Sequence, residues 1–235
     1  MKNAILLFLL LIASTLQAQT KIFNTLLQTH VAENGLVDYA SFQKDEAKLN
    51  TYISYLEKTT PNKSWSKNKE KAFWINAYNA YTLQLILANY PLKSILKIKQ
   101  KGKDAWNIPF AKIGEKTYTL NAIEHEILRK KFDDPRIHVG INCASGSCPQ
   151  LGNFAFTENN IDRQLERLMK LFINDASRNQ ISEKRIKISK IFEWFTEDFT
   201  KKGSLIDYFN QYATIKIKKK AKISYLTYDW SLNEQ

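Results

Sequence analysis

A long apolar stretch dominates the pattern of hydrophobic and polar positions along the chain. It extends from Glu70 to Tyr90, EKAFWINAYNAYTLQLILANY, and contains no glycine or proline before Pro91. The stretch is too long for one strand and a proline stops it, so the pattern predicts one long helix. Apolar side chains occur on nearly every face of this helix, which predicts that other elements surround it.

Two asparagines interrupt the apolar helix. Asn76 and Asn79 are three residues apart, so they share one face. A buried amide without a hydrogen-bond partner costs roughly 1–3 kcal/mol, so both side chains need partners. We therefore expect this face to support either a polar core network or the floor of a site.

Shorter elements are predicted around the central helix. Amphipathic periodicity indicates helices near residues 23–30, 43–57, 120–132, 160–176, 191–199 and 205–212. Short strands or extended segments are predicted at residues 106–110, 112–118, 136–142, 185–189 and 216–222. Ser66 is the expected N-cap of the central helix. The sequence thus predicts an α+β fold: a single domain with a long buried central helix, surrounding helices and a small mixed or antiparallel sheet.

The first 18 residues have the features of a secretory signal peptide. Lys2 supplies a positive charge, Ala4–Ala13 supplies a short apolar run, and Ala18 is a small residue suited to cleavage. The apolar run is shorter than the ~20 residues that a transmembrane helix needs. We therefore expect an exported protein, periplasmic or secreted, without a transmembrane segment.

Size and charge narrow the possible partners. Residues 19–235 suffice for one domain, with an N-terminal helical part over 19–66 and a core over 67–235. The whole chain carries a net charge of +12. In the stretch 216–222, Lys and Ile alternate at strand spacing, which indicates a solvated strand face or, alternatively, attraction to anionic surfaces. No nucleic-acid motif accompanies the charge, so nucleic acid is not an expected partner.

Both cysteines of the chain lie in one polar loop. The loop follows the strand predicted at 136–142 and reads CASGSCP, from Cys143 to Pro149. Loops at strand ends commonly carry functional groups on a rigid scaffold. Three states of the pair remain open: a reactive thiol at Cys143, a Cys143–Cys148 disulfide, and two inert buried thiols. The close ligand spacings of zinc sites are missing, so we predict neither a metal nor a cofactor.

A cysteine nucleophile needs a base or an ion-pair partner. In a strand, His138 and Asn142 face one way and Cys143 faces the other, roughly 16 Å from His138 at ~3.3 Å per residue. His138 and Cys143 meet only if the chain bends sharply at Asn142. Otherwise the partner of Cys143 comes from elsewhere, such as His125 or Glu124.

The helix predicted at 120–132 contains a second polar group. Glu124 falls within its apolar stripe, where a carboxylate is costly to bury unless it is paired. Glu124 and His125 are adjacent and project about 100° apart, and Arg129 lies one turn beyond His125. Two roles for Glu124 are consistent with this pattern: a structural contact with a buried arginine or hydroxyl, or a part in a functional site.

Four motifs, in this order, resemble a known family. They are FWINAYNAYTL at Phe73–Leu83, LNAIEHEILR at Leu120–Arg129, DPRIHVGINCASGSCPQL at Asp134–Leu151 and YDWSLN at Tyr228–Asn233. Together they resemble the family catalogued as domain of unknown function 547, whose bacterial members include exported proteins. The family has no assigned activity, so the resemblance implies only that its motif residues converge in space. These residues are Asn76, Asn79, Glu124, His125, Arg129, His138, Asn142, Cys143, Ser147, Cys148 and Pro149.

Two functional hypotheses follow. In the first, the protein is a thiol-dependent hydrolase or acyl transferase acting on a peptide or a cell-wall amide. Cys143 is the nucleophile, either histidine is the base, Glu124 or Asn142 orients that histidine, and Asn76 helps polarise the carbonyl. The candidate catalytic residues are Cys143, His138, His125, Glu124, Asn142 and Asn76, and the candidate binding residues are Asn79, Arg129, Ser147 and Cys148.

In the second hypothesis, the protein is a non-catalytic periplasmic binding module. The polar cluster is then a hydrogen-bonded core, and a Cys143–Cys148 disulfide braces the loop. The expected ligand is a small molecule, a peptide or a glycan, and anionic surfaces are a further class of partner.

Overall fold

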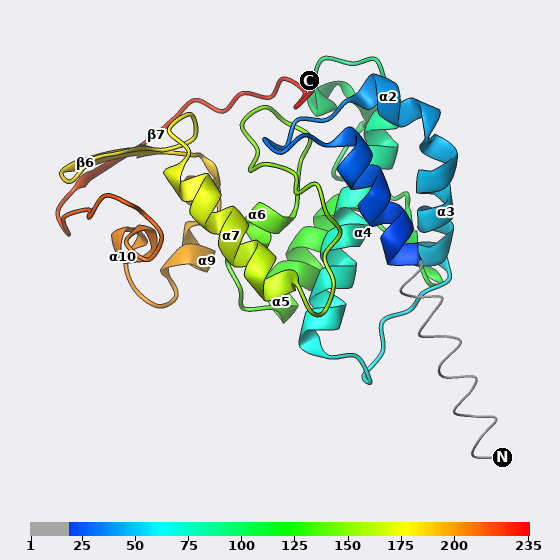
Figure 1. The fold of residues 1–235 in the computed structure, drawn as a ribbon, viewed down its shortest axis with the longest axis horizontal. Helices are drawn as coiled ribbons and strands as arrows, with labels where there is room; N and C mark the ends of the chain where they lie inside the picture. Colours follow the sequence, from blue (N-terminus) through cyan, green and yellow to red (C-terminus); the bar gives the residue numbers. More distant parts are fainter. Residues whose placement is uncertain (1–18) are drawn as a thin grey trace.

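The helix α4, Lys67–Leu87, runs through the middle of the molecule (Figure 1). The computed structural model describes residues 19–235, so the predicted signal peptide lies outside the described residues. Ser66 caps α4, and its Oγ accepts a hydrogen bond from the backbone N–H of Lys69 at 3.1 Å. Every residue from position 71 to position 83 is buried. The predicted central helix, its cap and its burial on all faces are confirmed.

Helices near the N-terminus cover one side of α4. Residues 19–30 are helical, followed by α2 at Tyr39–Lys44 and α3 at Glu46–Glu57. Both α2 and α3 contact α4. The buried face of α3 is the predicted one and consists of Leu49, Tyr52, Ile53 and Leu56.

The opposite side of α4 packs against η2 and α7. The helix η2, Ala122–Leu128, is a π-helix and continues into the α-helix α5, Arg129–Lys131. The helix predicted over residues 120–132 is therefore confirmed, but its first part is a π-helix, which is wider than an α-helix. The helix α7, Ile161–Asn174, has a one-sided apolar stripe. The buried members of this stripe are Ile161, Leu165, Leu168, Met169, Phe172 and Ile173.

The prediction of a strand at residues 136–142 is wrong. Ile137–Gly140 forms the short helix α6 instead. Asp134 starts this turn, because its Oδ1 accepts a hydrogen bond from the backbone N–H of Arg136 at 3.1 Å. A Cβ at Gly140 would lie 2.9 Å from a side chain of α7 and 3.1 Å from one of α4, so the turn fits closely between these helices. Periodicity alone does not separate a short buried strand from a buried helical turn.

Small sheets complete the α+β fold, as predicted. The pairs β1–β2 and β3–β4 are antiparallel, and in the third sheet β6 pairs antiparallel with β5 and parallel with β7. The strands are β1 Lys99–Gln100, β2 Lys103–Asp104, β3 Ala111–Ile113, β4 Lys116–Tyr118, β5 Gln180–Ile181, β6 Arg185–Ile188 and β7 Lys222–Tyr225. The remaining helices are η1 Ile95–Lys97, α8 Ile191–Trp194, α9 Thr196–Thr200 and α10 Leu205–Phe209.

The strand predicted in the lysine-rich stretch 216–222 is displaced. Only its last residue, Lys222, belongs to β7, which lies largely beyond the stretch. Ile217 is buried, but Ile215 and Ile223 are 44% and 39% exposed, so the isoleucines of this stretch do not form one buried face. The parallel pairing with β6 decides the position of β7, and this pairing is not visible in the local alternation.

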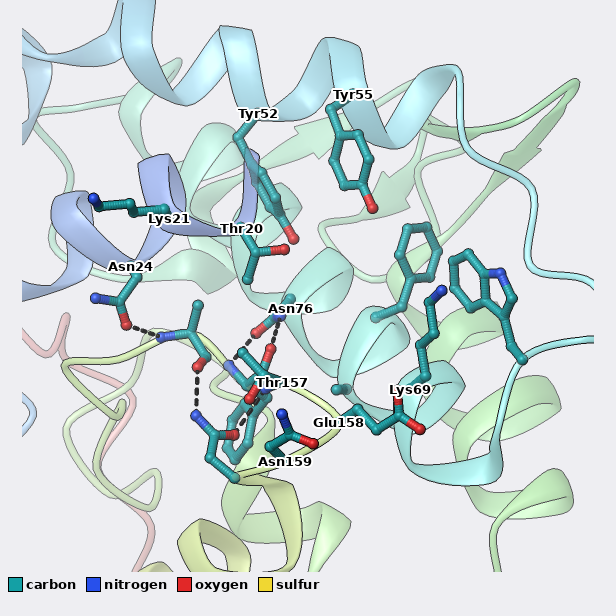
Figure 2. A pocket seen from close by; sticks show the side chains of 16 residues that line it. Thr20, Lys21, Asn24, Tyr52, Tyr55, Lys69, Asn76, Thr157, Glu158 and Asn159 are labelled. Carbon is teal, nitrogen blue, oxygen red and sulfur yellow. Dashed lines mark hydrogen bonds between the residues drawn. The ribbon is translucent and has the colours of Figure 1, made fainter. Parts of the chain in front are cut away.

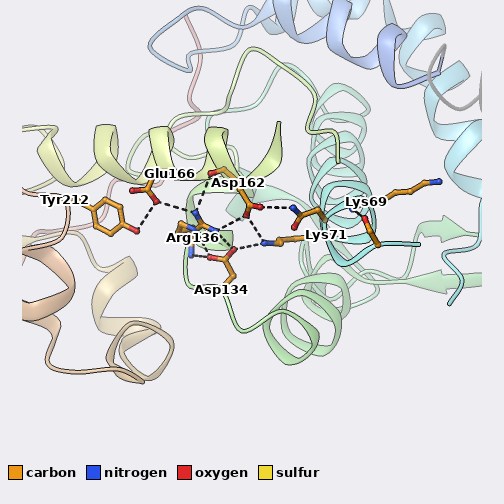
Figure 3. Close-up of polar contacts among 9 residues, drawn as sticks. Lys69, Lys71, Asp134, Arg136, Asp162, Glu166 and Tyr212 are labelled. Carbon is orange, nitrogen blue, oxygen red and sulfur yellow. Dashed lines mark hydrogen bonds and ion pairs between the residues drawn. The ribbon is translucent and has the colours of Figure 1, made fainter. Parts of the chain in front are cut away.

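A charged network joins α4, the segment before α6, and α7 (Figure 3). Lys71 Nζ lies 2.7 Å from Asp134 Oδ2, and Arg136 Nε lies 2.9 Å from Asp134 Oδ1. Arg136 also reaches Asp162 at 3.1 Å and Glu166 at 3.3 Å on α7. Burial raises the pKa of Asp134, but the hydrogen bonds from Arg136 and Lys71 outweigh it and lower the pKa to about 2.

The C-terminal segment returns from β7 to the N-terminal helices (Figure 1). Leu232 N–H donates to the carbonyl of Lys93 at 3.0 Å, and Tyr39 OH donates to Asn233 Oδ1 at 2.7 Å. One hydrophobic core includes residues from Phe23 to Ile217. Among residues 19–235, no helix combines the length and apolar character needed to cross a bilayer. The boundary expected at residue 67 stays a prediction.

Candidate functional site

A cavity of about 180 Å³ lies on the face of α4 that carries Tyr78. The helix η2, the helix α6 with the loop that follows it, α8 and the C-terminal segment supply its walls. We call it the thiol cavity. Five of the predicted site residues line it, namely Glu124, His125, His138, Cys143 and Cys148.

The sulfur of Cys143 is surrounded by hydrogen-bonding groups. It lies 3.1 Å from Ser145 Oγ and 3.3 Å from Tyr228 OH, and these two hydroxyls are 3.0 Å from each other. The backbone N–H of Cys143 donates to Cys148 Sγ at 3.1 Å, and both cysteines are free thiols. Cys143 is partly exposed, whereas Cys148 is buried.

These contacts separate the two thiols chemically. Hydrogen bonds from Cys148, Ser145 and Tyr228 lower the pKa of Cys143 and outweigh the opposing effect of burial. Burial and the adjacent Cys143 raise the pKa of Cys148 well above its ordinary value. Cys143 is therefore the more acidic thiol of the pair, and Cys148 is the less acidic one, whose sulfur accepts a hydrogen bond from the backbone N–H of Cys143.

Asparagine side chains hold the cysteine loop in place. Asn79 Nδ2 donates to the carbonyl of Gly140 at 2.8 Å, and Asn79 Oδ1 accepts from the backbone N–H of Asn142 at 2.9 Å. Asn142 in turn accepts from the N–H of Ala144 at 2.8 Å and donates to the carbonyl of Pro149 at 2.9 Å. Ala144 has a φ of +55°, a left-handed conformation that costs a non-glycine residue roughly 1–2 kcal/mol. The asparagine bonds stabilise this turn, so Asn79 and Asn142 position Cys143.

The C-terminal segment holds the loop from its other side. Gly146 N–H donates to the carbonyl of Ser231 at 2.6 Å, and Ser147 N–H donates to the carbonyl of Asp229 at 3.0 Å. Ser147 Oγ accepts from the N–H of Asp229 at 2.8 Å. A Cβ at Gly146 would lie 2.9 Å from both Asp229 Oδ2 and Ser231 Oγ, so glycine permits this close approach. The approach brings Tyr228 to the Cys143 sulfur.

Glu124 is a buried carboxyl group in the same cavity. Its side chain is on the π-helix η2, and its residue is 7% exposed. Tyr78 OH donates to Glu124 Oε2 at 3.3 Å. Burial, followed by the negative charge of Cys143, raises the pKa of Glu124 to about 7. The negative charge of Cys143 therefore favours the protonated form of Glu124.

The histidines line the cavity but do not hydrogen-bond to Cys143. His138 Nε2 lies 2.8 Å from Asp198 Oδ2, and its ring stacks on Phe195 at a centroid distance of 4.0 Å. His125 Nδ1 lies 3.0 Å from Arg129 Nη1. In the described part of the chain, no hydrogen bond joins either imidazole to the Cys143 sulfur. The direct histidine–cysteine contact considered from the sequence is therefore not formed.

Arg129 determines the tautomer of His125. A guanidinium is always a donor, so His125 Nδ1 is the acceptor, and the neutral ring carries its proton on Nε2. Burial and the charge of Arg129 lower the pKa of His125, which keeps the ring neutral at pH 7. Asp198 fixes Arg129 through contacts of 2.6 and 3.2 Å. His125 is thus a hydrogen-bond donor through Nε2 rather than a base.

Aromatic rings form a wall of the cavity. Trp230 contacts Trp106 at 5.6 Å, Trp194 at 5.9 Å and Tyr228 at 4.6 Å between ring centroids. Trp194 is 46% exposed and also lines the cavity. These aromatic residues and Asp198 were not predicted as site residues. The motif YDWSLN, which contains Tyr228 and Trp230, is the sequence signal that could have identified part of this wall.

Asn76 is not in the thiol cavity. Its Nδ2 donates to the carbonyl of Phe156 at 2.7 Å, and its Oδ1 accepts from the N–H of Phe156 at 2.9 Å. Both polar atoms are therefore occupied in a tie between α4 and the segment before α7. Within the described residues, no group of three or more His, Cys, Asp or Glu side chains is arranged to hold a metal ion.

Comparison with known proteins agrees with the motifs that build the cavity. Residues 62–173 match the model of the family described as "Protein of unknown function, DUF547". The chain resembles this family over α4, η2, α6 and the cysteine loop, whereas Asp198 and Tyr228 lie outside the matched stretch. No curated protein and no solved structure matches the chain.

Proposed function

We propose that the protein is a thiol-dependent hydrolase or acyl transferase, in which Cys143 is the nucleophile and Glu124 moves protons. The observation that carries the proposal is the position of the Cys143 sulfur. It borders a concave cavity, two hydroxyls lie within 3.3 Å of it, and the carboxyl of Glu124 borders the same cavity. A stabilised thiolate and a carboxylic acid that line one cavity supply the nucleophile and the proton donor for an acyl transfer.

The reaction steps balance with these two groups alone. The Cys143 thiolate attacks the carbonyl carbon of an amide, a C–S bond forms, and the carbonyl electrons move to oxygen. When the C–N bond breaks, the departing amine takes the proton of the Glu124 carboxylic acid and leaves a thioester. Water or a second amine then attacks the thioester, gives a proton to the Glu124 carboxylate, and releases the thiolate.

In this proposal His125 replaces Asn76 as the group that stabilises the carbonyl oxygen. The proton on His125 Nε2 makes that nitrogen a donor to an anionic oxygen in the cavity. His138 supports the site from behind, because its hydrogen bond to Asp198 also fixes the carboxylate that holds Arg129. The roles first considered for the histidines as bases are therefore replaced by donor and positioning roles.

The rate of thiol alkylation against pH tests the nucleophile. We expect iodoacetamide to label Cys143 much faster than Cys148, with a midpoint below the ~8.5 of an ordinary cysteine. p-Nitrophenyl acetate should give a burst of nitrophenol with the native protein and with Cys148→Ser, and none with Cys143→Ser. Equal labelling of both thiols, or a midpoint at or above ~8.5, would contradict the proposal.

A disulfide-braced binding module is the second candidate. One observation favours it: Cys148 Sγ lies only 3.1 Å from the Cys143 backbone nitrogen, so the two side chains are immediate neighbours. Export, which we propose from the leader-like features of residues 1–18, would place the pair where disulfides persist. Protein isolated without reductant would then show no free thiol, and no ester burst would appear before or after reduction.

A further inference from the structure

A second and larger cleft lies on the other face of α4. Its volume is about 770 Å³, and Asn76 borders it, whereas Tyr78 borders the thiol cavity. Two residues apart on a helix are about 200° apart around its axis, so the two spaces are on opposite faces. The helix over residues 19–30, α3 and the segment 155–160 complete this cleft, which we call the α3–α4 cleft (Figure 2).

One wall of the α3–α4 cleft is held rigidly by asparagine amides. Asn76 makes the paired hydrogen bonds to Phe156, and Asn24 Oδ1 accepts from the N–H of Ala155 at 3.0 Å. Asn160 Nδ2 donates to the carbonyl of Ala155 at 3.1 Å. Figure 2 shows these bonds along the 155–160 segment. A wall that is formed before a ligand arrives reduces the entropy cost of binding.

Aromatic rings form another side of the cleft. Phe73 meets Trp65 edge to face at 5.3 Å and Tyr55 at 6.5 Å between centroids. Trp65 and Tyr55 are only partly buried, so their rings border the open space. In Figure 2 the hydroxyl of Tyr55 points from α3 into the cleft. Ligand pockets of this size combine apolar rings with a few oriented polar groups.

The charge of the cleft is positive. Lys69 lies with its Nζ 4.6 Å from the centroid of Trp65, and Lys21 also borders the space. Within residues 19–235, neither lysine forms an ion pair with an acidic side chain. Glu158 is the acidic residue of the described lining, and its Oε1 accepts a hydrogen bond from Ser66 Oγ at 2.5 Å. A ligand with one negative charge complements this lining.

We propose that the α3–α4 cleft binds an acidic sugar, a pyranose ring that carries a carboxylate. The C–H face of the ring packs on the Trp65–Tyr55 side, as an amphipathic ring packs on aromatic surface. The hydroxyls of the sugar meet the amide of Asn159 and the hydroxyl of Tyr55. The carboxylate lies beside Lys69, whose charge is not neutralised within the protein. This site is separate from the thiol cavity and does not depend on the chemistry there.

Calorimetric titration with three sugars tests the proposal. The probes are glucuronic acid, N-acetylmuramic acid and the neutral N-acetylglucosamine. We expect at least one of the two acidic sugars to bind more tightly than the neutral sugar, by about fivefold or more. The acid that binds more tightly identifies whether the carboxylate belongs on the ring or on a side group.

Matched variants locate the binding. Lys69→Met should weaken acidic-sugar binding about fivefold, while Lys67→Met, an exposed lysine outside the cleft, should leave it unchanged. Trp65→Ala should weaken binding of every probe that binds, with the fold checked by circular dichroism. Alkylation of Cys143 should not alter the affinity, so loss of the thiol activity does not affect this test. The proposal is overturned if no sugar saturates at millimolar concentrations, if acidic and neutral sugars bind equally, or if Lys69→Met and Lys67→Met behave alike.

Discussion

Replacing Glu124 by glutamine should stabilise the protein at alkaline pH while it removes the proposed proton donor. Glutamine has the same shape, and its Oε1 can still accept the hydrogen bond from Tyr78. The replaced group is a carboxyl that is buried near a second acidic group, Cys143. A neutral amide at this position needs no proton to remain uncharged.

The magnitude follows from the pKa of the carboxyl. It is raised from an ordinary 4.5 to about 7 in the folded protein. Between these pH values the unfolded chain has released the proton and the folded protein has kept it, so the native free energy of unfolding falls as pH rises. The loss amounts to about 3 kcal/mol above pH 7. Glu124→Gln avoids this loss, so its advantage should be near zero at pH 4 and about 3 kcal/mol at pH 8.

Urea denaturation at both pH values measures this difference. Glu126→Gln is the matched control, because Glu126 is an exposed glutamate on the same helix and should show no gain between acidic and alkaline pH. In Glu124→Gln the alkylation midpoint of Cys143 should also move to lower pH, because the opposing charge is gone. Acylation by an activated ester should persist, whereas amide turnover should fall by about 10²–10⁴. If the gain in free energy of unfolding of Glu124→Gln over the native protein were equal at both pH values, the inference that Glu124 is buried in its neutral form would be refuted.

Three further predictions concern the surroundings of the site. Tyr228→Phe removes a hydrogen-bond donor from the Cys143 thiolate, so the pH midpoint of Cys143 alkylation, measured by mass spectrometry, should rise by about one pH unit. The control variant Tyr225→Phe should leave this midpoint unchanged. An unchanged midpoint in Tyr228→Phe would contradict the contact between Tyr228 and Cys143. The folded protein lowers the pKa of Asp134, so this carboxylate contributes about 2 kcal/mol to the free energy of unfolding above pH 4, and the contribution is lost as pH falls toward 2. Urea denaturation of Asp134→Asn at several pH values should show no such loss of stability in acid. Asn79→Ala leaves two buried backbone groups unpaired and should lower the free energy of unfolding by about 2–4 kcal/mol, and a change below about 1 kcal/mol would show that the tie is dispensable.

Local sequence features were sufficient for the elements whose determinants lie close together in the chain. The helix α4 follows from an uninterrupted apolar run and from Ser66 at its start, and both features act within one or two turns. The buried faces of α3 and α7 follow from their periodicity. The fold class follows from the mixture of such segments. The short turn α6 was not predictable, because a buried run of four residues has no period that separates a strand from a helix.

The sequence by itself identified the candidate reactive residues, and its family motifs implied that the motif residues converge in space; in the structure, five of these residues line the thiol cavity. Only the tertiary structure decided how they work together. Tyr228 is 85 residues from Cys143, and Asp198 is 60 residues from His138, yet each pair is in hydrogen-bond contact. Burial raised the pKa of Glu124, and one guanidinium set the tautomer of His125. These properties depend on distances through space and on the exclusion of water, neither of which a local pattern of residues contains.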